Sequence, residues 1–415
     1  MAADDSRQAL VQFTGHRHLT TRLLLATLSG RPVRISQIRS TSTNPGLARH
    51  ETNFIRLLDA VTNGSQIQFS MTGTTLVYRP GLITGSAEGL GASGGVIQHE
   101  MPRECARRGV SWWLIPLCVL APFSKGNVNV TFHGEGCVTS STETGDISAD
   151  TVRTAILPLY KWFGIERNIE LRILKRSCAP QAGKSAGGQV QLVFNHQVRL
   201  PKTLHVLNSG RVKKIRGVAY CVEVPKSNNE RMVHAARAIL NPLVPDTYIF
   251  SDASPAPLLS PRGATTNPTA GPRPRAATTI KAAVGFGLSL VAESSTGCLY
   301  SADVCSPPQG GLPPDQIAKH CAYQLLDKIR AAGCVDPVAA PTVLLLMAMG
   351  SQDVGRVALG RDVLATEHVI QLARDSYAFG GSAWGLREQS AGNESTDVVV
   401  SVVGRSVGNV GRKVA

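Results

Sequence analysis

The sequence predicts a mixed α/β protein, with a large body of three repeated α/β units and a smaller α/β domain inserted into it. Two observations support this prediction. Helical and strand-like hydrophobic patterns alternate along the whole chain. In addition, a helix, a glycine that ends it and a following strand recur at three places, residues 18–40, 148–177 and 365–404.

The first repeat shows the pattern most clearly. Residues 18–30 have the apolar spacing of a helix, which ends at a glycine, and residues 32–40 alternate as a strand does. A second amphipathic helix is predicted over residues 44–64. Residues 65–81 are predicted to form two strands separated by a glycine.

Between the second and third repeats the pattern changes. Strands and helices are predicted here at residues 210–224, 228–240, 245–250, 285–294 and 315–333. We therefore expect the inserted domain at residues 204–330. The body would then comprise residues 1–203 and 331–415.

Two segments have the composition of loops. Residues 252–280 are rich in Pro, Ala, Thr and Ser and cannot bury enough apolar surface to become ordered, which predicts a mobile loop. Residues 86–111 are rich in glycine and are predicted to form a second loop. The sequence gives no role for either segment.

The charge balance points to an anionic partner. The 415 residues include 43 Lys and Arg against 29 Asp and Glu, a net charge of +14. Such an excess is typical of proteins that bind nucleic acid, although a merely basic surface has the same composition. Aromatic residues are only 5% of the chain, which gives little support for base stacking. The residues expected to contact RNA phosphates are Arg17, Arg39, Lys184, Arg211, Lys213, Lys214 and Arg216.

Other classes of site have little support. The nine cysteines are scattered without a CxxC pair, so we expect reduced thiols in an intracellular protein and no metal site. The N-terminus lacks a secretory pattern. The longest apolar stretch, residues 112–123, contains two prolines and is too short to span a bilayer. No membrane partner and no cofactor are therefore expected.

The segment "CAPQAGKSAGGQVQLVF" resembles a phosphate-binding loop at first sight. In the Walker A motif a glycine stands where this chain has Cys178, and a helix follows the motif. Here the following residues alternate and are rich in Val and Phe, which predicts a strand. Without a helix N-terminus no aligned backbone amides would hold a phosphate, so a hairpin loop is favoured over an NTPase site.

Longer stretches resemble a known family. The segments "LLLATLSGRPVRISQIRS", "NPGLARHETNFIRLLDAVTNGSQIQFSMTGTTLVYRPGLITG", "KKIRGVAYCVEV", "GFGLSLVAESSTG" and "GGLPPDQIAKHCAYQLLDKI" closely resemble the RNA 3′-terminal phosphate cyclase superfamily, in the family's order. The resemblance is closest to the branch that works in ribosome biogenesis. It implies a body of three repeated units and an inserted domain.

The resemblance also implies that the cyclase nucleophile is lost. In active cyclases a histidine precedes a helix and becomes adenylylated by ATP. In this chain Val338 falls at about that position, with Pro341 and Thr342 replacing an Asp-Gln pair and no other histidine close by in the sequence. A valine side chain cannot form a phosphoramidate. Lys184 lies in what resembles an altered glycine loop of the cyclases.

The branch is associated with the nucleus and nucleolus, with maturation of small-subunit (18S) rRNA, and with a GTPase of the small-subunit processome and other processome proteins. We therefore expect a non-cyclase scaffold, a pseudoenzyme, that binds pre-rRNA and this GTPase. One alternative is an endoribonuclease that cuts pre-rRNA, for which Arg374 and Asp375 form a candidate pair of phosphate-binding cation and base. An ordinary pair on a helix surface explains the same residues. The second alternative is an active RNA 3′-phosphate cyclase with a relocated nucleophile.

Overall fold

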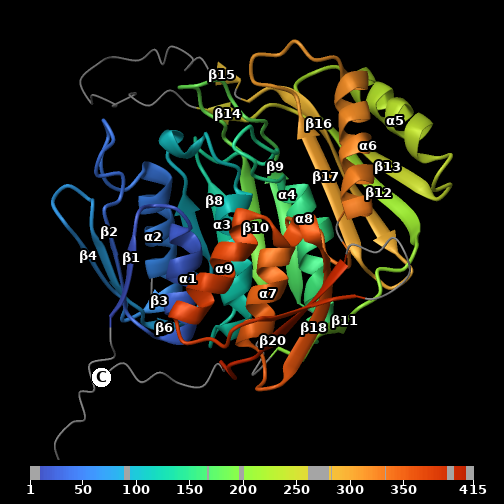
Figure 1. The fold of residues 1–415 in the computed structure, drawn as a ribbon. Helices are drawn as coiled ribbons and strands as arrows, with labels where there is room; N and C mark the ends of the chain where they lie inside the picture. The colour runs from blue at the N-terminus through green and yellow to red at the C-terminus, as the bar shows by residue number, and fades with distance from the viewer. Residues whose placement is uncertain are drawn as a thin grey trace, which may run out of the picture.

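The computed structural model describes residues 10–407 except 88–93, 166–167, 196–200, 260–279, 282, 332 and 390–396. Helices and strands alternate through the described residues, which confirms the α/β class (Figure 1). Most of the buried apolar side chains form one continuous core that extends through the body and the inserted domain. None of the described helices is long and apolar enough to cross a membrane.

The body contains three four-stranded sheets with the same strand order. In each sheet the first strand is parallel to the second, and the last two strands of the unit complete the sheet in antiparallel pairs. This repeated topology confirms the three-unit body. The strands are β1 (Val11–Thr14), β2 (Val33–Ser36), β4 (Gln66–Phe69) and β5 (Leu76–Arg79); β7 (Ile97–Glu100), β8 (Val128–His133), β9 (Ile169–Lys175) and β10 (Gln189–Phe194); and β11 (His205–Val206), β18 (Val354–Gly360), β19 (Gly385–Glu388) and β20 (Asp397–Val403).

Each unit also carries two helical segments. They are α1 (Leu19–Ser29) and α2 (Arg49–Val61) in the first unit, α3 (Ser111–Leu120) and the run that begins at α4 (Ala149–Thr151) in the second, and α7 (Ala340–Met349) with α9 (Glu367–Ala378) in the third. The short α8 (Arg361–Leu364) precedes α9, and β3 (Thr62–Asn63) pairs with β6 (Leu82–Ile83) beside the first sheet. Short 3-10 turns, η1 (Arg103–Cys105) and η2 (Ala121–Phe123), flank α3.

The helix–glycine–strand pattern found in the sequence does not fall on the same helix of each unit. Residues 18–40 are the first helix and second strand of their unit. Residues 148–177 and 365–404 instead begin with the second helix of theirs. Because each unit has two helices that are each followed by a strand, the same local pattern arises twice per unit.

The helical run after Ser148 is irregular. It continues from α4 as a π-helical turn, η3 (Val152–Ile156), and a 3-10 segment, η4 (Leu157–Phe163). Pro158 lies at the start of the last segment and has no backbone N–H, so the α-helical hydrogen bonding cannot pass through it. The sequence pattern predicted one regular helix here, and the proline is the reason for the difference.

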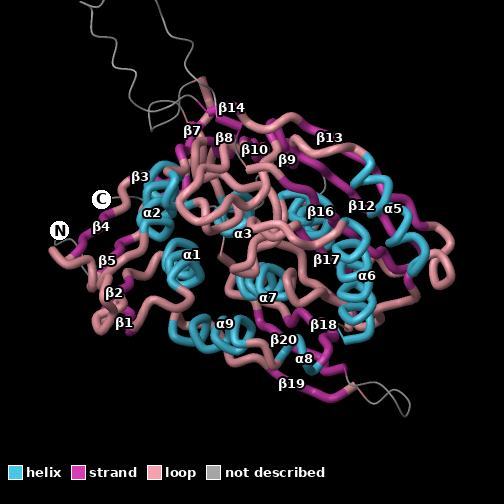
Figure 2. Tube along the Cα trace, turned by 90° about the horizontal axis from the view of Figure 1, so that it is seen from above, coloured by secondary structure: helices cyan, strands magenta, loops and turns pink. Residues whose placement is uncertain are grey.

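The inserted domain is one four-stranded sheet with two helices. The strand order is β13 (Thr247–Ser254), β12 (Val212–Val222), β16 (Gly285–Ser294) and β17 (Leu299–Cys305). The helices α5 (Ser227–Leu240) and α6 (Pro314–Ala331) lie against it on the same side (Figure 2). Strand β11 pairs with β18, so residues 205–206 belong to the third sheet and the expected boundary at 204 moves to after Val206. The insertion thus separates the first strand of the third unit from its first helix.

The two expected loops contain short strands. Residues 97–100 form β7, an edge strand of the second sheet, so the prediction of a loop over 86–111 is wrong there. Residues 88–93 lie outside the described residues. In the segment 252–280, β13 extends to Ser254, and β14 (Leu258–Leu259) pairs with β15 (Ile280–Lys281). The rest of the predicted mobile loop, residues 260–279, lies outside the described residues.

Candidate functional site

A pocket opens where four helices of the body meet. Helix α1 contacts α3 and α9, and α7 contacts the same two helices, so all three units contribute to one ring (Figure 2). The pocket has a volume of about 240 Å³. Its walls include Thr20, Leu24, Arg108, Trp112, Ile115, Asp146, Val338, Thr342, Leu345 and His368.

The polar side of this pocket is an arginine–carboxylate pair next to an indole ring. Nη2 of Arg108 lies 2.7 Å from Oδ1 of Asp146, and the backbone N–H of Gly109 donates to the other oxygen at 2.9 Å. Burial raises the pKa of Asp146, while Arg108 opposes that shift. The guanidinium carbon of Arg108 lies 5.4 Å from the centre of the Trp112 ring. The pocket therefore combines a cation with an aromatic surface.

One histidine lines the pocket and another contacts its Trp112 side chain, and the pKa of each is lowered below the ordinary value of 6.5. His50 packs edge-on against Trp112 with the ring centres 5.0 Å apart, and burial lowers its pKa to about 4. His368 lines the pocket itself, and burial lowers its pKa as well. A neutral imidazole has a free nitrogen lone pair, so His368 is chemically capable of nucleophilic attack.

The segment that leads into α1 is held against α9. Glu367 accepts hydrogen bonds from Nη1 of Arg17 at 3.0 Å and from the ring of His18 at 3.3 Å. His18 adopts a left-handed backbone conformation with φ of 57°, and its ring packs edge-on against His368 at 5.4 Å. Arg17 remains largely exposed, so the candidate phosphate contact is accessible although it is paired.

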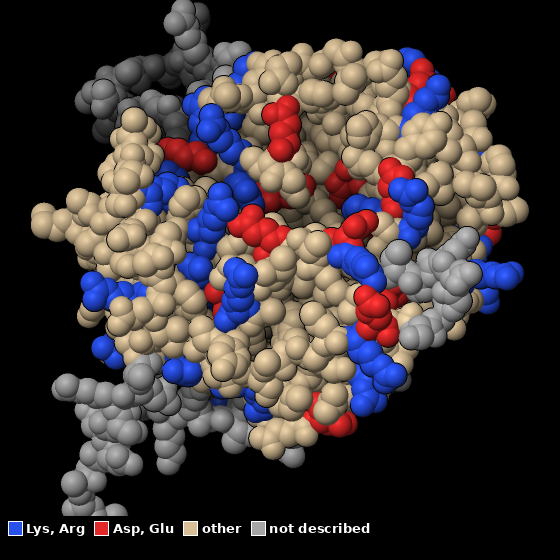
Figure 3. Space-filling model, viewed as in Figure 1, with Lys and Arg blue, Asp and Glu red and all other residues tan. Residues whose placement is uncertain are grey.

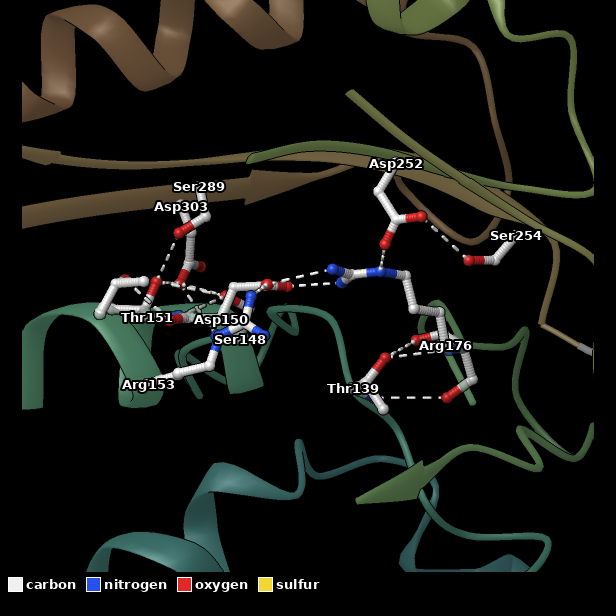
Figure 4. A network of polar contacts seen from close by, with 12 residues as sticks. Thr139, Ser148, Asp150, Thr151, Arg153, Arg176, Asp252, Ser254, Ser289 and Asp303 are labelled. Atoms are coloured by element: carbon white, nitrogen blue, oxygen red, sulfur yellow. Dashed lines mark hydrogen bonds and ion pairs between the residues drawn. The ribbon is translucent and has the colours of Figure 1, made fainter. Parts of the chain in front are cut away.

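A second polar cluster joins the body to the inserted domain, and Arg176 is its centre (Figure 4). Its Nη2 donates to Oδ1 of Asp150 at 3.1 Å, and its Nη1 binds the other oxygen at 2.5 Å. Its Nε binds Asp252 of the inserted domain at 2.5 Å. Both Arg176 and Asp150 are buried, so the pair is shielded from solvent.

Asp303 of the inserted domain forms the other half of this cluster (Figure 4). It accepts hydrogen bonds from the backbone and hydroxyl of Ser148, at 2.9 and 3.1 Å, and from the hydroxyl of Thr151 at 2.5 Å. Thr151 is also 2.9 Å from the hydroxyl of Ser289. Burial raises the pKa of Asp303, and these hydrogen bonds oppose the shift. The contacts fix the start of the α4 run against the inserted sheet.

The glycine loop with Lys184 is a hairpin connection. Strands β9 and β10 pair antiparallel on either side of it, which confirms the hairpin and excludes the helix that a P-loop needs. Gly188 lies so close to Ser177 and Cys137 that a Cβ atom would come within 2.4 Å of the Ser177 hydroxyl oxygen. Lys184 lies at the exposed tip.

Comparison with known proteins assigns the family. The family model described as RNA 3′-terminal phosphate cyclase matches residues 11–383. The chain belongs to this family. It is 36% identical to the human "RNA 3′-terminal phosphate cyclase-like protein" over 97% of both chains. It is 39% identical to the mouse protein of that name over 84% of this chain and 83% of the relative. It is 35% identical to "rRNA processing protein rcl1" of Schizosaccharomyces pombe over 98% of both chains.

Within this family, the residue expected at the nucleophile position faces the pocket. Val338 lines it together with Pro341 and Thr342, and the Val338 backbone N–H donates to Asp336 at 2.9 Å. Its apolar side chain supplies no nucleophile at this position. The sequence pattern missed His368, which lies thirty positions further on and lines the same pocket as Val338 because α9 packs against α7.

The candidate nuclease residues do not face one another. Arg374 is exposed, whereas Asp375 is buried, because neighbouring residues on a helix point about 100° apart. Asp375 lies 3.2 Å from Nε of Arg22 and accepts a hydrogen bond from Gln371 at 2.7 Å. The carboxylate therefore joins α9 to α1. Arg374 and Asp375 therefore do not form the ordinary ion pair on a helix surface that the sequence also allowed. A nuclease role for them stays a prediction.

The remaining basic candidates differ in their freedom to bind phosphate. Arg39 is held by both oxygens of Glu51, at 2.7 and 2.8 Å. Arg216 is held by Asp246 and Lys214 by Glu293. Arg211 and Lys213 are exposed. On the face in Figure 3, basic side chains are interspersed with acidic ones and form no single patch.

All nine cysteines are free thiols. The part of the chain that the structure describes contains no group of three or more His, Cys, Asp or Glu side chains that could hold a metal ion. The polar side chains that line the pocket are Arg108, Asp146 and His368 together with the hydroxyl groups of Thr20, Thr21, Ser111 and Thr342.

Proposed function

We propose that this protein is a non-cyclase factor of rRNA processing, which binds pre-rRNA and a GTPase of the small-subunit processome in the nucleolus. Two relatives that align over nearly their whole length are named rRNA processing proteins. The observation that carries the proposal is Val338, which replaces the expected nucleophile inside an otherwise well-formed pocket. The net charge of +14 supports RNA as the partner.

In this proposal the pocket binds without reacting. Arg108 offers a cation and Trp112 an aromatic face, which together suit a nucleotide of the RNA. The buried network around Arg176 keeps the inserted domain fixed relative to the pocket. The protein would then act by holding RNA and partner in one arrangement.

Depletion in cells tests the proposal. Loss of the protein is expected to cause accumulation of the precursor of small-subunit rRNA, and purification of the tagged protein should recover pre-rRNA together with a GTPase. Re-expression of wild-type protein and of a His368→Ala variant should both restore processing. Normal levels of small-subunit rRNA after depletion would contradict the proposal.

A second candidate function is nucleotidyl transfer through His368. The observation that favours it is the neutral imidazole of His368 beside Val338 in the same pocket. This function predicts a covalent AMP adduct that His368→Ala abolishes, and conversion of an RNA 3′-phosphate into a cyclic ester. If rRNA processing depended on this cyclisation, re-expression of His368→Ala after depletion would fail to restore it.

A further inference from the structure

The inserted sheet has two faces of different character. On β12 and β13 the residues that face α5 and α6, such as Ile215 and Ile249, are buried. Ile249 also lines a groove with residues of α5. Because side chains alternate along a strand, Tyr248 and Phe250 lie on the opposite face. They are 53% and 56% exposed.

The body covers only part of this second face. Arg176 packs 5.1 Å from the centre of the Tyr220 ring and binds Asp252, so the C-terminal ends of β12 and β13 are covered. Thr151 covers β16 at Ser289. Tyr248 and Phe250 lie in the N-terminal half of β13, which the described residues leave accessible.

The exposed rings form a preassembled pair. Tyr248 and Phe250 contact each other edge to face, with ring centres 4.6 Å apart and an interplanar angle of 81°. Single exposed apolar side chains are common on protein surfaces. Two large rings in contact on an open strand form a continuous aromatic surface, which is the form of surface on which nucleic-acid bases stack.

Cationic residues occupy neighbouring positions of the sheet on the same face as the rings. In the sheet register, Arg216 is opposite Tyr248 and Val218 is opposite Phe250, so the guanidinium and the rings share one face. Lys214 precedes Arg216 on that face, and both cations lie in ion pairs that are exposed to solvent. Such pairs exchange readily for a phosphate, because an exposed ion pair contributes little free energy. Arg211 and Lys213 extend the positive charge at the start of the strand.

We propose that this open face, formed by Lys214, Arg216, Val218, Tyr248 and Phe250, is a binding site for single-stranded RNA. Two bases would stack on the rings of Tyr248 and Phe250, and the phosphates between them would contact Arg216 and Lys214. Single-stranded RNA fits better than duplex, because paired bases cannot present their faces to the rings. This inference rests on the proposed RNA binding and locates it on the inserted domain, away from the pocket beside Val338.

The test uses the full chain and a fluorescein-labelled oligouridylate, with anisotropy measured over a range of salt concentrations. Tyr248→Ala with Phe250→Ala should weaken binding about tenfold or more. The slope of log affinity against log salt should stay unchanged, because the rings carry no charge. Phe250→Tyr should retain the affinity. The matched control is Tyr323→Ala on α6, which removes a ring of similar exposure, 57%, from outside this face.

The outcomes separate the two proposals. Wild-type protein that binds the oligouridylate, together with an equally tight double variant, would overturn the assignment of this face and leave RNA binding intact. Equal weakening by Tyr323→Ala would overturn it too, because the loss would not be specific to the face. A wild-type protein that binds no RNA would overturn the proposed function itself.

Discussion

The polar groups at the contact between the body and the inserted domain are less exposed to solvent than those at the pocket beside Val338. At the contact, Arg176 and Asp150 are buried and paired with each other, and the half-buried Asp303 is bound by hydroxyl groups. At the pocket, His368 and Trp112 line an accessible space. The first arrangement stabilises one geometry, and the second leaves groups available to a ligand.

The largest loss of stability is expected from breaking the Arg176 network between the body and the inserted domain. Arg176→Ala leaves the buried carboxylate of Asp150 with only the partly exposed Arg153, which should lower the free energy of unfolding by roughly 3 to 5 kcal/mol. Urea denaturation measures the change. The control Arg172→Ala removes an exposed ion pair with Glu170 and should leave the midpoint of urea denaturation unchanged. Equal stability of the Arg176 variant and wild type would show that the network does not hold the domains.

Breaking the ion pair between Arg22 and Asp375 should lower the free energy of unfolding slightly less. Asp375→Ala leaves Arg22 buried without its carboxylate and should lower the free energy of unfolding by about 3 kcal/mol. Arg374→Ala should leave stability unchanged, because its side chain is exposed. Cleavage of pre-rRNA by purified protein is therefore tested with Arg374→Ala alone. Cleavage by wild type that this variant abolishes would support the nuclease alternative.

Acid should destabilise the packing of His50 against Trp112. The folded-state pKa of His50 is lowered to about 4, below the ordinary value of 6.5, so the unfolded chain binds a proton first as the pH falls. The stability that His50 contributes is thus present above pH 6.5 and lost between pH 6.5 and 4. Allowing for solvent screening, we expect about 2 kcal/mol. Denaturation of His50→Gln should show a shallower pH dependence in that window, and an unchanged dependence would contradict the assignment.

The smallest effect is expected on RNA binding from Lys184, at the tip of the loop between β9 and β10. Lys184→Ala should weaken RNA binding slightly and lower the salt slope by about 0.7, the value for one phosphate contact on a single strand. Anisotropy titrations at several salt concentrations measure both quantities. An unchanged slope would mean that Lys184 does not contact phosphate.

The sequence predicts local structure better than it predicts which residues meet. The hairpin after Lys175 follows from the alternating residues of β10, and the repeated units follow from the recurring pattern. The strand β7 escapes detection because four residues beside a glycine-rich segment carry little periodicity. The presence of His368 and Val338 in one pocket depends on how α7 packs against α9, which no local pattern encodes.

Burial of Asp375 could have been foreseen. It lies three positions after Leu372 and four before Phe379, both of which are buried, so the helical period places it on the apolar face. A carboxylate on such a face needs a buried partner, and Arg22 on α1 supplies it. Which arginine would do so depends on the packing of α1 against α9.

Mass spectrometry of the intact protein after incubation with ATP and Mg²⁺ tests the central claim most directly. The claim is that the pocket beside Val338 has no cyclase nucleophile. We predict that the mass of the protein stays unchanged. A mass increase equal to one AMP, present in wild type and absent from His368→Ala, would contradict the claim and identify His368 as a relocated nucleophile.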